Sequence, residues 1–358
     1  MRAMVVKEFS QLRRDRRTLA MMIFLPALLL VVFGYAANFD VKRIPVVVVG
    51  PGASVAAAQL RAPFDVVERD PDAGRALAER RLRDGDAAAA IVTGTRPPLV
   101  LLDGSELFSA RSAETALAQQ AEPRTSGLHA SAFDVKVLFN PKLATSAVLV
   151  SGIAGLILLF IVTVTTSLGV VRERQAGTLE QLAVMPLRPS DVIVGKIAPY
   201  FLVGVLDLAA TVVLAVVVFS VPFNGSVVTL ALGGVLFLLV TTGMGVLIST
   251  VSENQGQAIQ LAIMTLLPQI LLSGLIFPVS SMAGGVRWIA YVLPLKYFID
   301  VTRGVMLRGA PIGSLWVPLL MLGVLGVAVL GLAVLRFRRD LAPAVRNEES
   351  RVADAVGA

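Results

Sequence analysis

The chain has 358 residues, of which 56% are hydrophobic and only 16% are charged, and its mean hydropathy is +0.78. About a quarter of the residues of a soluble protein are charged, so this composition excludes a soluble globular protein and predicts a polytopic α-helical membrane protein. The absence of cysteine excludes disulfides, and His129, the single histidine, leaves no histidine-based metal site. The net charge of +7 indicates membrane topology rather than nucleic-acid binding.

Residues 1–18 are predicted to form an amphipathic helix on the cytoplasmic membrane surface, because Met4, Val5 and Phe9 fall on one helical face and basic residues lie elsewhere. A plain basic anchor is the alternative. The apolar segment that follows, residues 19–37, is long for a signal peptide and contains a proline. We therefore predict a retained first span.

Six apolar segments have the length of about 20 residues that a membrane span needs. Basic residues gather before the first segment, between the second and the third, and after the sixth. The positive-inside rule therefore places both termini in the cytoplasm, together with the tail, which we predict to be disordered. The segments are residues 19–37, 148–171, 197–221, 227–251, 258–277 and 316–335, and the tail is residues 336–358.

Residues 38–146 are predicted to form a small extracytoplasmic α/β domain, inserted between the first and second spans, because strand and helix patterns alternate there. Asp72 is a candidate cap for the second helix. The expected strands are residues 45–49, 64–67, 87–92 and 99–102, and the expected helices are residues 53–60, 73–83 and 110–120.

The bundle formed by the second to sixth spans, residues 147–335, contains a connection that is too long for a turn. Residues 278–315 mix apolar and aromatic residues with proline and glycine, and no piece is long enough to span. The pattern predicts re-entrant or interfacial helices on the outer side, shielded by protein. The alternative is a seventh, broken span, which the basic tail argues against.

Residues 172–196 form a charged segment between two apolar runs. Thr178 and Gln181 form a T-x-x-Q capping box, and apolar residues then recur at helical spacing. Pro186 and Pro189 are expected to end this helix. A short amphipathic helix between two spans on the basic side is well placed to dock a cytoplasmic partner. A solvated surface helix is the alternative.

Polar residues interrupt two of the predicted spans. Asp207 lies in the middle of the third span, where a lone charge costs about 2.5–3.5 kcal/mol on insertion scales. It could belong to a translocation path or to proton-sensitive gating, or it could fix helix packing. Pro268, Gln269 and Ser273 interrupt the fifth span, which predicts either a kinked helix that lines the path or a packing site.

The motifs of an ATPase or a protease do not occur in the sequence. The nearest approach to a P-loop, at Gly195 and Lys196, lacks the hydroxyl residue that follows the lysine, and Ser190 replaces the first glycine. No H-E-x-x-H motif and no pair of intramembrane aspartates is present. We therefore expect no catalytic site, no metal site and no cofactor bound by this chain.

Several motifs, in their order and spacing, resemble the ABC-2 class of ABC-transporter membrane subunits, in the branch with a large outer domain after the first span. The family usually has proline after the methionine that corresponds to Met282, whereas this chain has Ala283. The matching pieces are IPVVVVG at 44–50, RLRDGDAAAAIV at 81–92, LLDGSE at 101–106, FNP at 139–141, the polar segment at 172–200, LSGLIFPVSSM at 272–282 and PLKYFIDVTRGVMLRG at 294–309.

The resemblance implies that the segment 172–196 is the coupling helix, which rests on a separate ATP-binding subunit that carries ATP and magnesium. The residues expected at this contact are Arg172, Glu173, Arg174, Gly177, Thr178, Glu180 and Leu182. It also implies an exporter in the bacterial inner membrane, built from two copies or from one copy and a homologous permease. An accessory protein on the outer side, and an amphipathic, drug-like or lipid-like substrate, fit this reading.

Two rival functions come from the same features. An ABC-coupled mechanotransmission subunit also has a large outer domain after its first span, but such proteins typically have four spans. An integral membrane enzyme or receptor would act without an ATPase partner.

Overall fold

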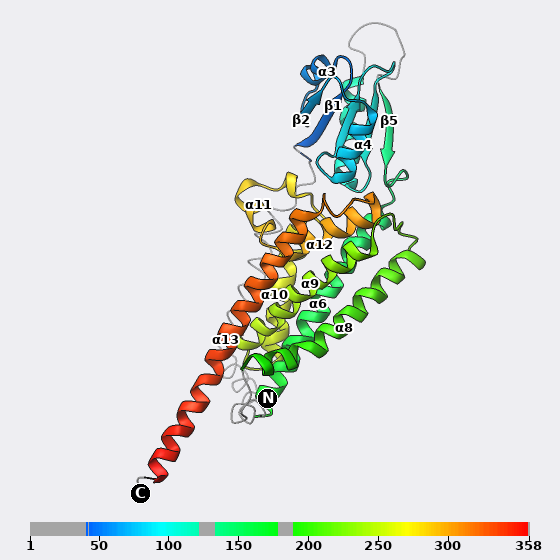
Figure 1. Ribbon diagram of the computed structural model, residues 1–358. Helices are drawn as coiled ribbons and strands as arrows, with labels where there is room; N and C mark the ends of the chain where they lie inside the picture. The colour runs from blue at the N-terminus through cyan, green and yellow to red at the C-terminus, as the bar shows by residue number, and fades with distance from the viewer. Residues whose placement is uncertain (1–40, 42, 122–132, 178–188, 357–358) are drawn as a thin grey trace, which may run out of the picture.

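The computed structural model describes residues 41, 43–121, 133–177 and 189–356. A mixed sheet covered by helices stands at one end of a bundle of long helices (Figure 1). We call the sheet and its helices the sheet domain, and the opposite end of the bundle the distal end. The predicted helix 1–18 and the predicted span 19–37 lie outside the described residues.

Among the described residues, five strands form the sheet, in the order β2-β1-β3-β4-β5. β1 is parallel to both of its neighbours, β3 and β4 are antiparallel, and β5 is parallel to β4. The four predicted strands are confirmed to within a few residues, whereas β5 was not predicted. The strands are β1 (Ile44–Val49), β2 (Phe64–Asp70), β3 (Ala89–Val92), β4 (Leu99–Asp103) and β5 (Asp134–Leu138).

Both faces of the sheet are buried, which explains the unbroken valines of β1. Successive side chains of a strand point to opposite faces. Val46 and Val48 pack in one cluster with α3 (Ala53–Gln59) and α5 (Leu107–Ala121). Val47 and Val49 pack in another cluster with α4 (Arg75–Asp84). Helices on both faces are therefore required by the strand sequence.

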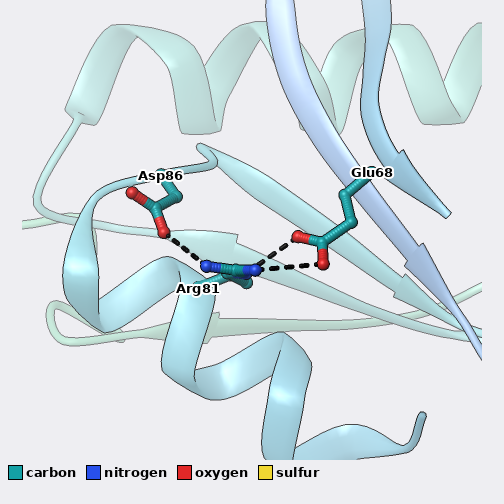
Figure 2. Close-up of polar contacts among 3 residues, drawn as sticks. All are labelled: Glu68, Arg81 and Asp86. Carbon is teal, nitrogen blue, oxygen red and sulfur yellow. Dashed lines mark hydrogen bonds and ion pairs between the residues drawn. The ribbon is translucent and has the colours of Figure 1, made fainter. Parts of the chain in front are cut away.

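Arg81 fastens α4 to the sheet (Figure 2). Its Nε lies 2.8 Å from Oε2 of Glu68 on β2, and its Nη1 donates to Asp86 Oδ2 at 3.0 Å. The predicted cap at Asp72 is wrong. Gly74 is the N-cap residue of α4, and the turn before it is held by Asp70, whose Oδ1 accepts from the backbone N–H of Asp72.

Four helices are long and apolar enough to cross a membrane among the residues that the structure describes. The chain therefore has the helices of a polytopic membrane protein. These spans are Thr145–Gln175 (α6), Ile197–Val217 within α8 (Pro189–Val217), Val227–Val251 (α9) and Trp316–Arg336 within α13 (Trp316–Val356). Each corresponds to one of the predicted spans.

The predicted fifth span and the tail need correction. The segment 258–277 corresponds to α10 (Gln255–Leu272), which ends five residues before the predicted end and is not among the four apolar helices. Gly274, with φ of 86°, follows the end of this helix. The tail was predicted to be disordered, but α13 continues to Val356. Alanine, glutamate and arginine, which favour helix, are frequent there.

Close contact between α6 and α9 forms the centre of the bundle. A Cβ added at Gly245 would lie 2.7 Å from the Cβ of Thr166 and 2.8 Å from the carbonyl oxygen of Thr163. The hydroxyl of Thr163 donates to the carbonyl of Thr241 at 3.2 Å. Small residues thus let two backbones approach, as is usual between membrane helices.

Short helices fill the connection between α10 and α13 beside the sheet domain (Figure 1). None of them is long enough to span, as predicted. Arg287 donates to the carbonyls of Ser280 and Met282, both at 2.9 Å, and so fixes the turn in which Ala283 stands instead of proline. The short helices are η1 (Val279–Ser281), α11 (Gly284–Ala290), α12 (Pro294–Thr302) and the π-helix η2 (Arg303–Arg308).

Three kinds of contact join the sheet domain to the bundle. Leu107 of α5 belongs to the apolar cluster of the bundle. Asn140 donates to the carbonyls of Gly104 and Ala144, and it thereby ties the end of β4 to the start of α6. Asp103, almost fully buried, lies 3.6 Å from Nη1 of Arg308 on η2.

The buried carboxyl of Asp103 predicts a pH-dependent stability. Burial raises its pKa to about 6, and Arg308 opposes that rise. Because the folded pKa lies above the ordinary value near 4, the folded chain holds the proton more tightly. The protonated carboxyl of Asp103 therefore adds to the stability of the folded chain. This stabilisation is complete below about pH 4 and is lost as the pH rises through about 6. Acidification from pH 7 to 5 should therefore raise the midpoint of thermal unfolding more in the wild type than in Asp103→Asn. An equal rise of the midpoint in the wild type and in Asp103→Asn would contradict this prediction.

Candidate functional site

The C-terminal end of α6 is bound to the turn between α9 and α10 at the distal end of the bundle. Nη1 of Arg174 donates to the carbonyl of Ser249 at 3.0 Å and to that of Ser252 at 3.1 Å. Ser249 lies in the last turn of α9 and Ser252 is its C-cap residue, and carbonyls at a helix C-terminus have no intrahelical partner. The guanidinium therefore satisfies two free carbonyls and also complements the negative end of the helix dipole.

A second bridge runs from α6 to the first residue of α10. Nε of Arg172 donates to Oε1 of Gln255 at 3.2 Å, and Nε2 of Gln255 donates to Oε1 of Gln175 at 3.1 Å. We call this group the distal junction. It consists of Arg172, Arg174 and Gln175 on α6 with Ser249, Ser252 and Gln255 of the α9–α10 turn.

Side-chain capping makes the α9–α10 turn rigid. Oδ1 of Asn254 accepts from the backbone N–H of Gln257, and Oε1 of Gln257 accepts from the backbone N–H of Glu253, both at 2.9 Å. This reciprocal pair resembles a capping box and fixes the start of α10. A displacement of the end of α6 is therefore passed to both α9 and α10.

The predicted docking residues divide between this junction and the part that follows it. Arg172, Glu173 and Arg174 lie on the last turn of α6, so the segment 172–196 begins inside a long helix and not in a loop. Gly177, with φ of 72°, ends that helix in a left-handed conformation. Thr178, Glu180 and Leu182 lie outside the described residues, and α8 begins at Pro189.

The residues predicted for a translocation path lie on two helices, both of which pack against α6. Asp207 is half-buried on α8. Pro268 lies within α10, and Gln269 is buried there, where its Oε1 accepts from the backbone N–H of Leu295 at 3.1 Å. Gln269 thus holds the start of α12, which is the packing role that the sequence left open.

Ser273 is the C-cap residue of α10, and within the described part of the chain its buried hydroxyl has no hydrogen-bond partner. Among the same residues, no group of histidine, cysteine and acidic side chains could hold a metal ion.

Sequence reasoning missed the acceptors of the distal junction. No sequence pattern indicates that Gln255 faces α6, and the serine carbonyls that Arg174 binds carry no side-chain signal. The junction has a mechanical consequence: it joins the end of α6 to the α9–α10 turn, so that these two parts move together.

Comparison with known proteins places the chain in a family. The family described as ABC-2 family transporter protein matches residues 16–335. The probable multidrug ABC transporter permease YbhS of Escherichia coli is 30% identical over 369 residues, which cover 95% of this chain and 97% of that protein.

Two further permeases of Escherichia coli are similar. The probable multidrug ABC transporter permease YbhR is 27% identical over 365 residues, which cover 94% of this chain and 98% of that protein. The inner membrane transport permease YhhJ is 32% identical over 211 residues, or 58% of this chain and 56% of that protein. With its long apolar helices, the chain therefore belongs to the ABC-2 family of transporter proteins, as a multi-pass membrane protein.

Proposed function

We propose that this chain is the membrane subunit of an ATP-driven exporter and that it docks a separate ATP-binding subunit through the segment 172–196. The observation that carries the proposal is the distal junction, in which Arg174 joins the end of α6 to the last turn of α9. A force on the segment after Gly177 would reach α6, α9 and α10 together. A loop that only connects two spans would not need such fastening.

The proposed arrangement in the membrane has six spans. This number counts the four described spans together with α10 and the segment 19–37, both of which enter as part of the proposal. Both termini and the distal junction lie in the cytoplasm, and the sheet domain lies outside. The functional unit is a dimer of this chain, or of this chain and a homologous permease, with two ATP-binding subunits that carry the ATP and magnesium.

The proposed cargo is an amphipathic, drug-like or lipid-like molecule that moves outward. Two of the relatives are named multidrug permeases. The spans of this chain are apolar with few charges, which suits a cargo with a large apolar surface. An accessory protein on the outer side could bind the sheet domain. ATP closure in the partner would rearrange the helices by hinge or shear motion.

The docking proposal is tested by a charge reversal in the segment itself. Glu180→Lys should abolish recovery of the ATP-binding subunit with the tagged chain from membranes, because it reverses a charge that the segment 172–196 would present to the partner. The measurement is the ratio of the two subunits after purification, together with ATP hydrolysis and transport by the complex. Arg336→Ala, which changes an exposed residue near the same end of the bundle, serves as a control. Normal recovery of the partner with Glu180→Lys would contradict docking at this segment.

Asp207→Asn tests the translocation path. If the carboxylate of Asp207 contacts cargo or gates its movement, this variant should lose transport while it keeps both normal folding and the partner. The substitution preserves the size of the side chain, so packing alone predicts no such loss. Transport and thermal unfolding are measured on the same preparation, and unchanged transport would exclude the path role.

A further inference from the structure

The π-helix η2 is the place where the sheet domain, the α8–α9 loop and the bundle meet. Nδ2 of Asn224, in the α8–α9 loop, donates to the carbonyl of Leu307 at 2.8 Å, and its backbone N–H donates to that of Met306 at 3.1 Å. A Cβ added at Gly225 would lie 2.6 Å from the carbonyl oxygen of Val305. π-Helical turns are rare in proteins, and those that do occur are often found at functional sites.

The last residue of η2 sends its side chain into the sheet domain. The side chain of Arg308 is only 9% exposed, and its Nη1 lies 3.6 Å from Oδ2 of Asp103, at the end of β4. The guanidinium also lies against Gly85, where an added Cβ would be 2.7 Å from Nη1. Arg308 therefore contacts the domain at two elements, β4 and the end of α4.

Local geometry explains why an arginine fits this position. Gly85 is the C-cap residue of α4, with φ of 82°, and a helix C-terminus attracts a positive charge. Asp103 supplies the opposite charge, and its Oδ1 is already held by the backbone N–H of Ser105 at 2.8 Å. The neighbouring Arg81 keeps α4 in place against β2 (Figure 2). The receiving site for Arg308 is thus preorganised within the domain.

We propose that Arg308 is a positioning residue that locks the sheet domain to η2, so that the domain moves as one body with α12 and η2. Other contacts at this boundary are the apolar packing of Leu107, the bonds of Asn140 near the chain crossing into α6, and a hydrogen bond from Nη2 of Arg111 to Oγ1 of Thr145 at 3.4 Å. Arg303 on η2 is attracted by Glu106 of the sheet domain, and the direct ion pair of Arg308 with Asp103 adds to this resistance against rotation about the crossing. The lock resists it, because removing one partner of a buried ion pair leaves the other charge buried and unpaired.

Through the ion pair of Arg308, movement of the bundle during transport would be transmitted to the sheet domain. Movement of α8 or α9 reaches η2 through Asn224, and Arg308 passes it to the sheet domain. This last step rests on the proposed function. The lock itself does not, since it concerns only how the domain is held. The two claims can therefore fail separately.

The experiment uses the absence of cysteine from the chain. Spin labels are attached to Val55→Cys on α3 and to Ile312→Cys in the loop after η2, both of which are exposed positions. The distribution of distances between the labels is measured by pulsed electron spin resonance on the full chain in lipid nanodiscs. It should be narrow in the otherwise wild-type chain and broader, with a shift of its mean, in Arg308→Ala. Arg83→Ala, an exposed arginine of α4, should leave it unchanged.

A double-substitution cycle separates the lock from general damage to the fold. Arg308→Gln and Asp103→Asn should each broaden the distribution, and the double variant should be no broader than either single variant. These substitutions nearly keep the side-chain size, so they also serve if Arg308→Ala does not fold. A narrow distribution in every folded variant, or additive broadening in the double variant, would overturn the lock. With the ATP-binding subunit and ATP present, a distance that changes in the wild-type chain would overturn movement as one body.

Discussion

Arg174→Ala is expected to lower transport strongly while the complex still hydrolyses ATP. Its guanidinium binds the carbonyls of Ser249 and Ser252, and hydrogen bonds to a charged group contribute about 1.5–3 kcal/mol each. Without them the end of α6 is no longer fastened to α9, and the carbonyls at the end of α9 lose their partner. The ATP-binding subunit could then close without moving α9 and α10.

The size of this effect follows from the coupling free energy. Couplings between two sites are about 1–3 kcal/mol, or about 5–150-fold, and the contribution of even one hydrogen bond of Arg174, about 1.5–3 kcal/mol, lies within that range. We therefore expect transport per ATP hydrolysed to fall at least tenfold, that is by about 1.4 kcal/mol. Transport and ATP hydrolysis are measured on the same proteoliposomes, so that the ratio does not depend on the amount of active complex.

Two further variants make the result specific to the geometry. Arg174→Lys keeps the charge but not the planar fork that reaches both carbonyls, so an intermediate ratio is expected. Arg336→Ala removes an arginine side chain from an exposed position near the same end of the bundle. It should leave transport per ATP hydrolysed unchanged. If Arg174→Ala lowers transport and hydrolysis in equal proportion, the junction only supports the fold or the docking, and the coupling role is wrong.

The sequence predicted those elements whose pattern is local. The valines of β1 and the apolar length of α9 appear directly in the residues, and both elements lie where they were expected. β5 was missed because its short DVKVL segment is stabilised by pairing with β4, which is distant in sequence. Likewise, the end of α10 at Leu272 depends on the turn that follows, in which Gly274 has a positive φ.

The candidate site was predictable only in part, and for a related reason. The charges of Arg172 and Arg174 marked the segment as unusual, but their acceptors lie about 80 residues away in the turn after α9. Backbone carbonyls are the same for every residue type, so no pattern could reveal them. The sequence left Gln269 open between a path-lining and a packing role, and its bond to the backbone N–H of Leu295 became visible only with α12 in place.

Gly245→Ala is expected to destabilise the bundle, although it adds only one methyl group. The added methyl group would lie 2.8 Å from the carbonyl oxygen of Thr163 and 2.7 Å from the Cβ of Thr166. Neither atom belongs to the flexible end of a side chain, so α6 and α9 must move apart. Overpacking of this kind costs about 1–3 kcal/mol.

The separation of α6 and α9 also affects the distal junction. Ser249 and Ser252 lie one to two turns after Gly245 on or beside the same helix, so a shift of α9 displaces the carbonyls that Arg174 binds. We therefore expect Gly245→Ala to lower both the midpoint of thermal unfolding and transport per ATP hydrolysed. A loss of stability alone would show that the junction adapts to the shift.

Gly331→Ala is the matched control for this prediction. Gly331 lies in the apolar part of α13, where an added Cβ meets no atom within 4 Å. Alanine favours helix over glycine by up to about 1 kcal/mol, so this variant should unfold at the same temperature as the wild type or slightly higher. The two substitutions should thus affect the unfolding temperature differently, because the two glycines differ in their neighbours and not in helix propensity. If the two variants unfold alike, α6 and α9 are not held in the close contact that Gly245 permits.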